Sequence, residues 1–205
     1  MNRVAVFCGS SSGSVRAYGE GAKELGQALA EAGITLVYGG ASVGLMGVVA
    51  DTVLRHGGQV IGVIPKSLVD HELAHDNLTE LHIVDSMHER KALMAELSEG
   101  FITMPGGSGT MEEFFEVFTW AQLGFHQKPC GLLNLNGYYT SLIQFFSHMV
   151  QEGFMKKEYP SMVLSDTKAK SLLEQMNRYQ PPETFKWEEK RKSVLSQEKE
   201  VQKNN

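Results

Sequence analysis

Residues 4–13 read VAVFCGSSSG, an apolar run of strand length that passes directly into a loop of glycine and serine. The run does not alternate between apolar and polar side chains, so both faces of the strand are expected to be covered. This pattern is typical of a parallel sheet with helices on both sides. In such folds ligands bind beyond the carboxyl ends of the strands, where this loop would lie.

The rest of the chain repeats the same alternation, with glycine or proline at most joints. We therefore expect an α/β fold, a doubly wound Rossmann-like parallel sheet of about seven strands with helices on both faces. The predicted strands are residues 4–8, 34–38, 60–64, 81–84, 101–104, 131–135 and 162–164. The predicted helices are residues 15–32, 45–56, 87–97, 111–123, 138–151 and 168–178.

The 205 residues suffice for one domain with a full core but are too few for two ordinary domains. Residues 1–180 are predicted to form a single nucleotide-binding α/β domain. From residue 181 to 205, Lys and Glu mix with few apolar side chains, which predicts a charged, loosely ordered tail.

Charge and cysteine content narrow the class of protein. The formal net charge of -5 argues against a broad nucleic-acid interface, which needs a basic face. No export signal and no run of 18 apolar residues is visible, so neither secretion nor a membrane partner is expected. Cys8 and Cys130 fall in apolar strands and are interpreted as core residues of a cytoplasmic protein.

Three glycine-rich loops follow predicted strands, at residues 8–13, 39–47 and 105–110. All three are expected to converge on one crevice beyond the sheet. The spacing fits neither the dinucleotide fingerprint G-x-G-x-x-G nor the Walker loop G-x-x-x-x-G-K-[ST], so an NAD enzyme and a Walker-type NTPase have little support.

The third loop, PGGSGT at residues 105–110, carries the most information. Gly106, Gly107 and Gly109 would permit positive φ, so that successive amides point inward as an anion nest. Thr110 would then open a helix whose positive end meets a phosphate. The alternative is a tight strand-to-helix turn without a ligand.

Two capping boxes compete with a functional interpretation. Glu113 stands three residues after Thr110, so its carboxylate could simply return to the Thr110 amide. Residues 86–89, SMHE, form the same pattern at the start of the helix that carries Arg90 and Lys91. On spacing alone these two cations are expected to be solvated surface charges.

The segment HELAH at residues 71–75 satisfies the zinc-protease pattern H-E-x-x-H. It is short, lies in a connection of the sheet and offers no third ligand on a following helix. No metal site is expected there.

Two motifs together, SMHERK at residues 86–91 and PGGSGTMEE at residues 105–113, resemble the Lonely guy (LOG) family, whose pattern is P-G-G-x-G-T-x-x-E. The resemblance covers about three quarters of the chain. It implies a cytokinin riboside 5′-monophosphate phosphoribohydrolase, an enzyme often mislabelled as a lysine decarboxylase. Such an enzyme cleaves the N-glycosidic bond of an N6-substituted adenosine 5′-monophosphate, needs no cofactor and is usually a homodimer.

The resemblance also assigns residues. Arg90 and Glu113 match the catalytic pair. Ala41 departs from a usual third consecutive glycine, and Ser108 replaces a larger residue, which puts base preference and rate in doubt. The implied substrate-binding residues are Glu72, Arg90, Lys91, Gly106, Gly107, Ser108, Gly109, Thr110, Met111, Glu112, Glu113 and Thr119.

Two further expectations concern partners and class. The helix from Met111 shows a wide apolar surface, part of which is predicted to be an intersubunit face of a homodimer. The alternative function is a carrier of the molybdenum cofactor, because such carriers share this fold and glycine-rich loop. Retention of Arg90 and Glu113 favours the enzyme. The residues of the apolar surface are Phe114, Phe115, Val117, Phe118, Trp120 and Ala121.

Overall fold

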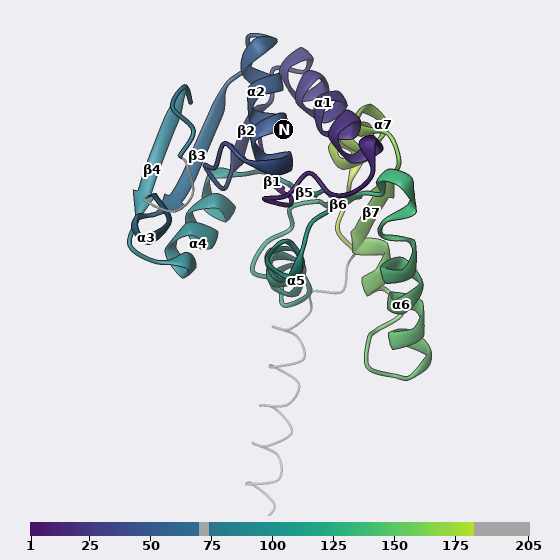
Figure 1. Ribbon diagram of the computed structural model, residues 1–205. Helices are drawn as coiled ribbons and strands as arrows, with labels where there is room; N and C mark the ends of the chain where they lie inside the picture. Colours follow the sequence, from purple (N-terminus) through teal and green to yellow (C-terminus); the bar gives the residue numbers. More distant parts are fainter. Residues whose placement is uncertain (70–73, 183–205) are drawn as a thin grey trace, which may run out of the picture.

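The computed structural model describes residues 1–69 and 74–182. Within them, seven strands form one parallel sheet in the order β4-β3-β2-β1-β5-β6-β7 (Figure 1). The predicted doubly wound α/β fold is confirmed. The strands are β1 Arg3–Phe7, β2 Thr35–Tyr38, β3 Val60–Pro65, β4 Glu80–Val84, β5 Phe101–Thr103, β6 Cys130–Leu133 and β7 Val163–Asp166.

All six predicted helices are present, with ends within three residues of the predicted ones. The described residues contain three additional short helical segments that were not predicted, because four residues or fewer carry too little periodicity to be recognised. The helices are α1 Arg16–Glu31, α2 Gly44–Arg55, α3 Lys66–Val69, α4 Met87–Leu97, α5 Ser108–Gln122, α6 Thr140–Gln151 and α7 Ala169–Arg178. The 3₁₀ segments are η1 Leu135–Gly137 and η2 Tyr159–Met162.

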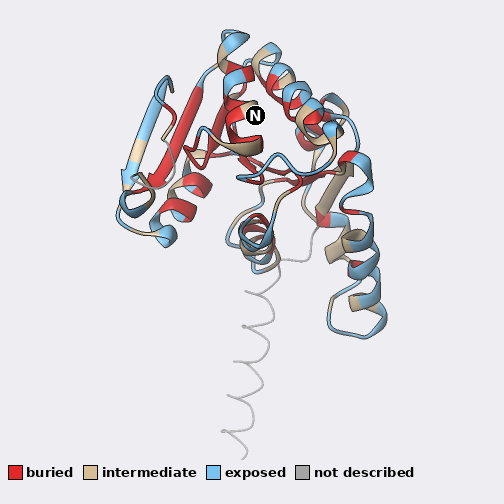
Figure 2. Cartoon of the chain, viewed as in Figure 1, coloured by how far each residue is buried: buried red, intermediate tan, exposed pale blue. Residues whose placement is uncertain are grey.

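The central strands are buried on both faces, as the unbroken apolar pattern of β1 predicted. Val4 and Val6 pack in a core cluster with α1, α2 and α7, whereas Ala5 and Phe7 pack in another with residues of α4 and α5. Figure 2 shows the contrast with β4 at the edge of the sheet, which is largely exposed. The helices thus form one layer on each side of the sheet.

The chain reverses its direction of travel across the sheet between β1 and β5, which are neighbours in the sheet but not in the sequence. The helix after β1 covers one face and the helix after β5 covers the other. The loops after these two strands therefore diverge and leave a crevice, which is the usual ligand site of an open α/β sheet.

Backbone hydrogen bonds join the loops at this point. The Gly9 amide donates to the Pro105 carbonyl at 3.1 Å, and the Leu45 amide donates to the Gly9 carbonyl at 3.0 Å. The predicted convergence of the three glycine-rich loops is confirmed.

The predicted tail lies outside the described residues from position 183 onward. Across the described ranges, each helix is too short or too polar to cross a membrane.

Candidate active site

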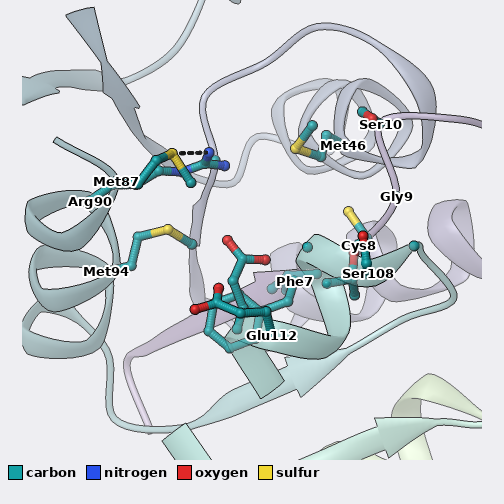
Figure 3. A pocket seen from close by; sticks show the side chains of 16 residues that line it. Phe7, Cys8, Gly9, Ser10, Met46, Met87, Arg90, Met94, Ser108 and Glu112 are labelled. Atoms are coloured by element: carbon teal, nitrogen blue, oxygen red, sulfur yellow. Dashed lines mark hydrogen bonds between the residues drawn. The ribbon is translucent and has the colours of Figure 1, made fainter. Parts of the chain in front are cut away.

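A cavity of about 300 Å³ opens at the carboxyl ends of β1 and β5. It lies between the first and third glycine loops, α4 and the start of α2 (Figure 3). Of the predicted site residues, Arg90, Gly107, Ser108, Gly109, Thr110, Glu112 and Glu113 line it. The other lining residues are Val6, Phe7, Cys8, Gly9, Ser10, Gly39, Met46, Met87 and Met94.

The third glycine loop differs from the prediction in two ways. α5 begins at Ser108 with Gly107 as its N-cap, so Thr110 is the third helical residue rather than the first. No side chain caps the helix, so the predicted capping box of Thr110 and Glu113 is wrong. None of the loop glycines has positive φ, so the predicted nest conformation is wrong as well.

Close packing accounts for Gly106, whereas Gly107 and Gly109 lie in open surroundings. A Cβ at Gly106 would collide with Oγ1 of Thr110 and lie 2.8 Å from the amide nitrogen of Gly9. A Cβ at Gly107 or Gly109 would meet nothing within 4 Å. The latter two glycines face open space, where a bound group can approach the backbone directly.

The start of α5 has free backbone amides. The amides of residues 107–110 have no hydrogen-bond partner among the described residues. These free N–H groups and the positive end of the helix dipole favour a phosphate. The predicted phosphate loop stays a prediction, and its amides belong to the N-cap and first turn of a helix rather than to a left-handed nest.

Arg90 and Lys91 are not solvated surface charges, which contradicts the prediction from spacing. Their side chains are 7% and 8% exposed. The capping box before them does form, because the Glu89 amide donates to Oγ of Ser86 at 3.1 Å. The Glu89 carboxylate returns to the Asp85 amide rather than to Ser86.

The Arg90 guanidinium is buried and has no carboxylate partner among residues 1–69 and 74–182. Its Nη1 donates only to the sulfur of Met87, at 3.7 Å, and its Nε has no partner in the described chain. Figure 3 shows Arg90 beside Met87 at one side of the cavity, with Met46 across from it. A buried cation with an unsatisfied N–H is costly unless a ligand completes it. Arg90 is therefore ready to bind an anionic or hydrogen-bond-accepting group of a substrate.

Glu113 lines the same cavity and has an unusual pKa. Burial raises the pKa of its carboxyl to about 7, although the positive charge of Arg90 acts in the opposite direction. No salt bridge joins the two side chains. A carboxyl that titrates near neutral pH inside a cavity is suited to proton transfer.

The shifted pKa of Glu113 predicts a pH-dependent effect on stability. The pKa of this carboxyl is 4.5 in the unfolded chain and about 7 in the folded protein. The buried carboxyl therefore lowers the free energy of unfolding progressively as pH rises from 4.5 to about 7, and the cost stays constant above that range. Glu113→Gln should therefore raise the melting temperature by a few degrees at pH 8 and leave it unchanged at pH 4. Thermal unfolding at both pH values tests this, and an equal shift at both would contradict it.

Lys91, a predicted substrate contact, forms ion pairs with two carboxylates of α5. Its ammonium bonds to Glu112 and, at 3.1 Å, to Glu116, so it joins α4 to α5 beside the cavity rather than lining it. The ion pair between Lys91 and Glu112 joins the residues that stand next to Arg90 and Glu113 in the sequence. The predicted substrate contact of Lys91 stays a prediction.

Three further predicted site residues, Gly106, Met111 and Thr119, are not among the described residues that line the cavity. Gly106 borders an adjacent hollow of about 250 Å³, Met111 packs beside the core cluster under α6, and Thr119 is exposed on α5. Glu72 and His71 lie outside the described residues. His75, from the same segment, is buried and bonds to Asp51 at 3.0 Å.

Several cavity residues were not predicted. Met87 and Met94 lie three residues before and four residues after the predicted Arg90, a spacing that puts all three on one face of α4 and was available from the sequence. Cys8 was correctly predicted to be buried, but it also lines the cavity. Burial and the nearby Glu113 raise the pKa of its thiol, so it is a neutral wall residue rather than a nucleophile.

Comparison with known sequences identifies a matching family and several related proteins. The sequence model of a family described as "Possible lysine decarboxylase" matches residues 46–176. The chain is 50% identical over 179 residues to a probable cytokinin riboside 5′-monophosphate phosphoribohydrolase of Oryza sativa subsp. japonica, across 87% of this chain and 80% of that protein. It is also 50% identical over 181 residues to a cytokinin riboside 5′-monophosphate phosphoribohydrolase of Arabidopsis thaliana, across 88% and 83% of the two chains.

Solved structures share the architecture at much lower identity. A molybdenum cofactor carrier protein from Chlamydomonas reinhardtii aligns with a TM-score of 0.66 at 20% identity, across 86% of this chain and 95% of that one. The molybdenum cofactor binding protein from Rippkaea orientalis gives 0.64 at 19% identity, across 86% and 95%. At this identity the likeness concerns the fold alone.

Proposed function

The chain belongs to the LOG family of cytokinin riboside 5′-monophosphate phosphoribohydrolases, and from this membership we propose that it hydrolyses the N-glycosidic bond of N6-substituted adenosine 5′-monophosphates. One observation carries the proposal. The free amides of residues 107–110 and the carboxyl of Glu113 lie on successive turns of one helix and line one cavity. A phosphate and a sugar carbon of the same substrate can therefore be held at once.

The chemistry follows from the charge that develops during the reaction. Breaking the bond between C1′ and the base builds positive charge on the ribose, as in other glycoside hydrolyses. A fixed carboxylate near C1′ stabilises that charge more than it stabilises the ground state. Glu113 is the group that meets this requirement.

Water supplies the nucleophile in the proposed step. Its oxygen bonds to C1′ while the bond to the base breaks, and the electron pair of that bond leaves with the base. Glu113 accepts one proton of the water and later releases it to solvent, and the departing base takes up a proton from solvent water, which gives free base and ribose 5-phosphate. Arg90 holds the substrate in register, and the amides at the start of α5 anchor the 5′-phosphate.

The product assay tests this function. Purified protein is incubated with isopentenyladenosine monophosphate, with AMP and with the matching nucleosides, and free base and ribose 5-phosphate are measured. We expect release from the monophosphates and a value of kcat/KM for nucleosides lower by about 100-fold or more, because charge-assisted bonds to the phosphate contribute roughly 1.5–3 kcal/mol each. No release from any nucleotide, together with tight pterin binding, would instead favour a cofactor carrier.

We also propose a homodimer that uses the apolar side of α5 and α6. Phe114 and Phe118 are buried within the chain, since both are 1% exposed and their ring centroids lie 6.3 and 5.5 Å from that of Phe146. Phe125 and Phe145 remain 74% and 49% exposed near the same helices. Large exposed aromatic side chains are typical of interfaces.

Light scattering measures this assembly directly. We expect a mass of twice the 22.7 kDa of one chain. A monomer mass at micromolar protein concentration would contradict the dimer.

A cytoplasmic location is part of the proposal. It is supported by the two cysteines, which are both buried and unpaired, as suits a reducing compartment. Fluorescence microscopy of a tagged chain tests it.

A further inference from the structure

We propose that Tyr138 is a positioning residue that sets the direction of the peptide between Gly106 and Gly107 and thereby the affinity of α5 for phosphate. The inference rests on the proposed function only in taking the start of α5 as the phosphate site. Tyr138 does not line the cavity that holds Glu113, and it would act through the backbone.

Three successive carbonyl groups, those of Met104, Pro105 and Gly106, are held by donors from outside the glycine loop. The Tyr139 hydroxyl donates to the Met104 carbonyl at 2.6 Å, and the Gly9 amide donates to the Pro105 carbonyl at 3.1 Å. The Tyr138 hydroxyl donates to the Gly106 carbonyl at 2.6 Å. The last of these bonds is the one next to the phosphate site.

A trans peptide couples the carbonyl to the following amide. Its C=O and N–H point in opposite directions, so fixing the Gly106 oxygen toward Tyr138 turns the Gly107 N–H to the other side of the loop. Gly107 is exposed and has no side chain that could restrict this peptide by packing. Among the described residues, the hydroxyl of Tyr138 is the hydrogen-bond donor that holds the oxygen of this peptide.

The same bond keeps a second amide free. In a continuing helix the Thr110 N–H would donate to the carbonyl four residues earlier, which belongs to Gly106. Here that carbonyl accepts from Tyr138, and the Thr110 amide has no partner among the described residues. The amides of Gly107 and Thr110, which are both available to a phosphate, thus depend on the hydroxyl of Tyr138.

The chain delivers Tyr138 to this position by a tight turn. Asn136 and Gly137 have φ of 50° and 72°, and Asn134 accepts the Tyr139 amide at 2.7 Å. The rings of Tyr138 and Tyr18 pack edge to face with their centroids 5.7 Å apart, and Tyr138 is 43% exposed. Loss of its hydroxyl would leave this packing in place.

The test uses Tyr138→Phe and measures binding without turnover, by calorimetry with inorganic phosphate, ribose 5-phosphate and adenosine. We expect affinity for both phosphate ligands to fall about tenfold and affinity for adenosine to stay within twofold. With a nucleoside monophosphate as substrate, KM should rise while kcat changes little, because the lost contact is made in ground and transition states alike.

Tyr18→Phe is the matched control, because it removes a hydroxyl from the neighbouring ring, which donates no hydrogen bond in the described chain. It should leave all three affinities unchanged. Unchanged phosphate affinity in Tyr138→Phe, an equal loss for adenosine, or an equal loss in Tyr18→Phe would overturn the proposal. Because the readout is binding, an inactive protein with normal phosphate affinity would count against the proposed hydrolase and not against Tyr138.

Discussion

Glu113→Gln is expected to lower kcat for isopentenyladenosine monophosphate by about 100-fold or more while nucleotide binding survives. Glutamine keeps the size of the side chain but carries no negative charge to stabilise a cationic ribose and accepts no proton from water. The free amides of residues 107–110 are untouched, so the phosphate still has its anchor. Single-turnover kinetics and calorimetric binding of ribose 5-phosphate separate the two effects.

Glu96→Gln provides the control, because it makes the same change of charge on α4 at an exposed position outside the cavity. Its activity should remain within twofold of the wild type. A Glu113→Gln enzyme with full turnover would remove Glu113 from the mechanism.

The pH profile gives an independent check of the same residue. Because the pKa of Glu113 is about 7, the carboxylate form is lost as pH falls below neutrality, and kcat/KM should fall with it. The second ionisation of the substrate phosphate, near pH 6, adds to this fall of kcat/KM on the acid side of the pH profile. The residual activity of Glu113→Gln should show only the phosphate ionisation.

Gly39→Ala is expected to lower kcat/KM by about 10- to 100-fold, although position 39 contacts no catalytic group except Arg90. An added Cβ would collide with Nη2 of Arg90 and lie 3.0 Å from its Cζ. The backbone at position 39 suits alanine, since its φ is not positive. The Arg90 guanidinium therefore has to move, and even a small displacement of a group that orients the substrate lowers the rate.

The acid limb of the pH profile should move upward in Gly39→Ala. Arg90 lowers the pKa of Glu113 against the effect of burial, so moving the guanidinium away raises that pKa further. Both enzymes are compared on the same substrate, and the phosphate ionisation cancels from the difference.

A double-mutant cycle identifies the route of the effect. If Gly39 acts by making room for Arg90, Gly39→Ala should cost almost nothing further in an Arg90→Gln background. Gly19→Ala is the control, since a Cβ there meets nothing within 4 Å. Additive losses in the double variant would contradict the role assigned to Gly39.

Local sequence failed where two local structures were equally plausible. Thr110 and Glu113 have the spacing of a capping box, yet the helix begins three residues before the predicted start, so that box does not form. Arg90 and Lys91 follow a true cap and seemed to belong to a polar surface. α4 has no purely apolar face because its buried side carries these two cations, which the periodicity of apolar residues cannot indicate.

The sequence by itself determined the layered α/β architecture, the order of its elements and the edge at which ligands bind. These follow from unbroken apolar strands, helix-length spacers and glycines at the strand ends, all of which are local patterns. Only the tertiary structure decided which charges are buried, which amides stay free and how far the pKa of Glu113 is shifted. Those properties arise from contacts between residues distant in the chain, such as Arg90 with Gly39 and Tyr138 with Gly106, and burial by distant segments leaves no mark on local spacing.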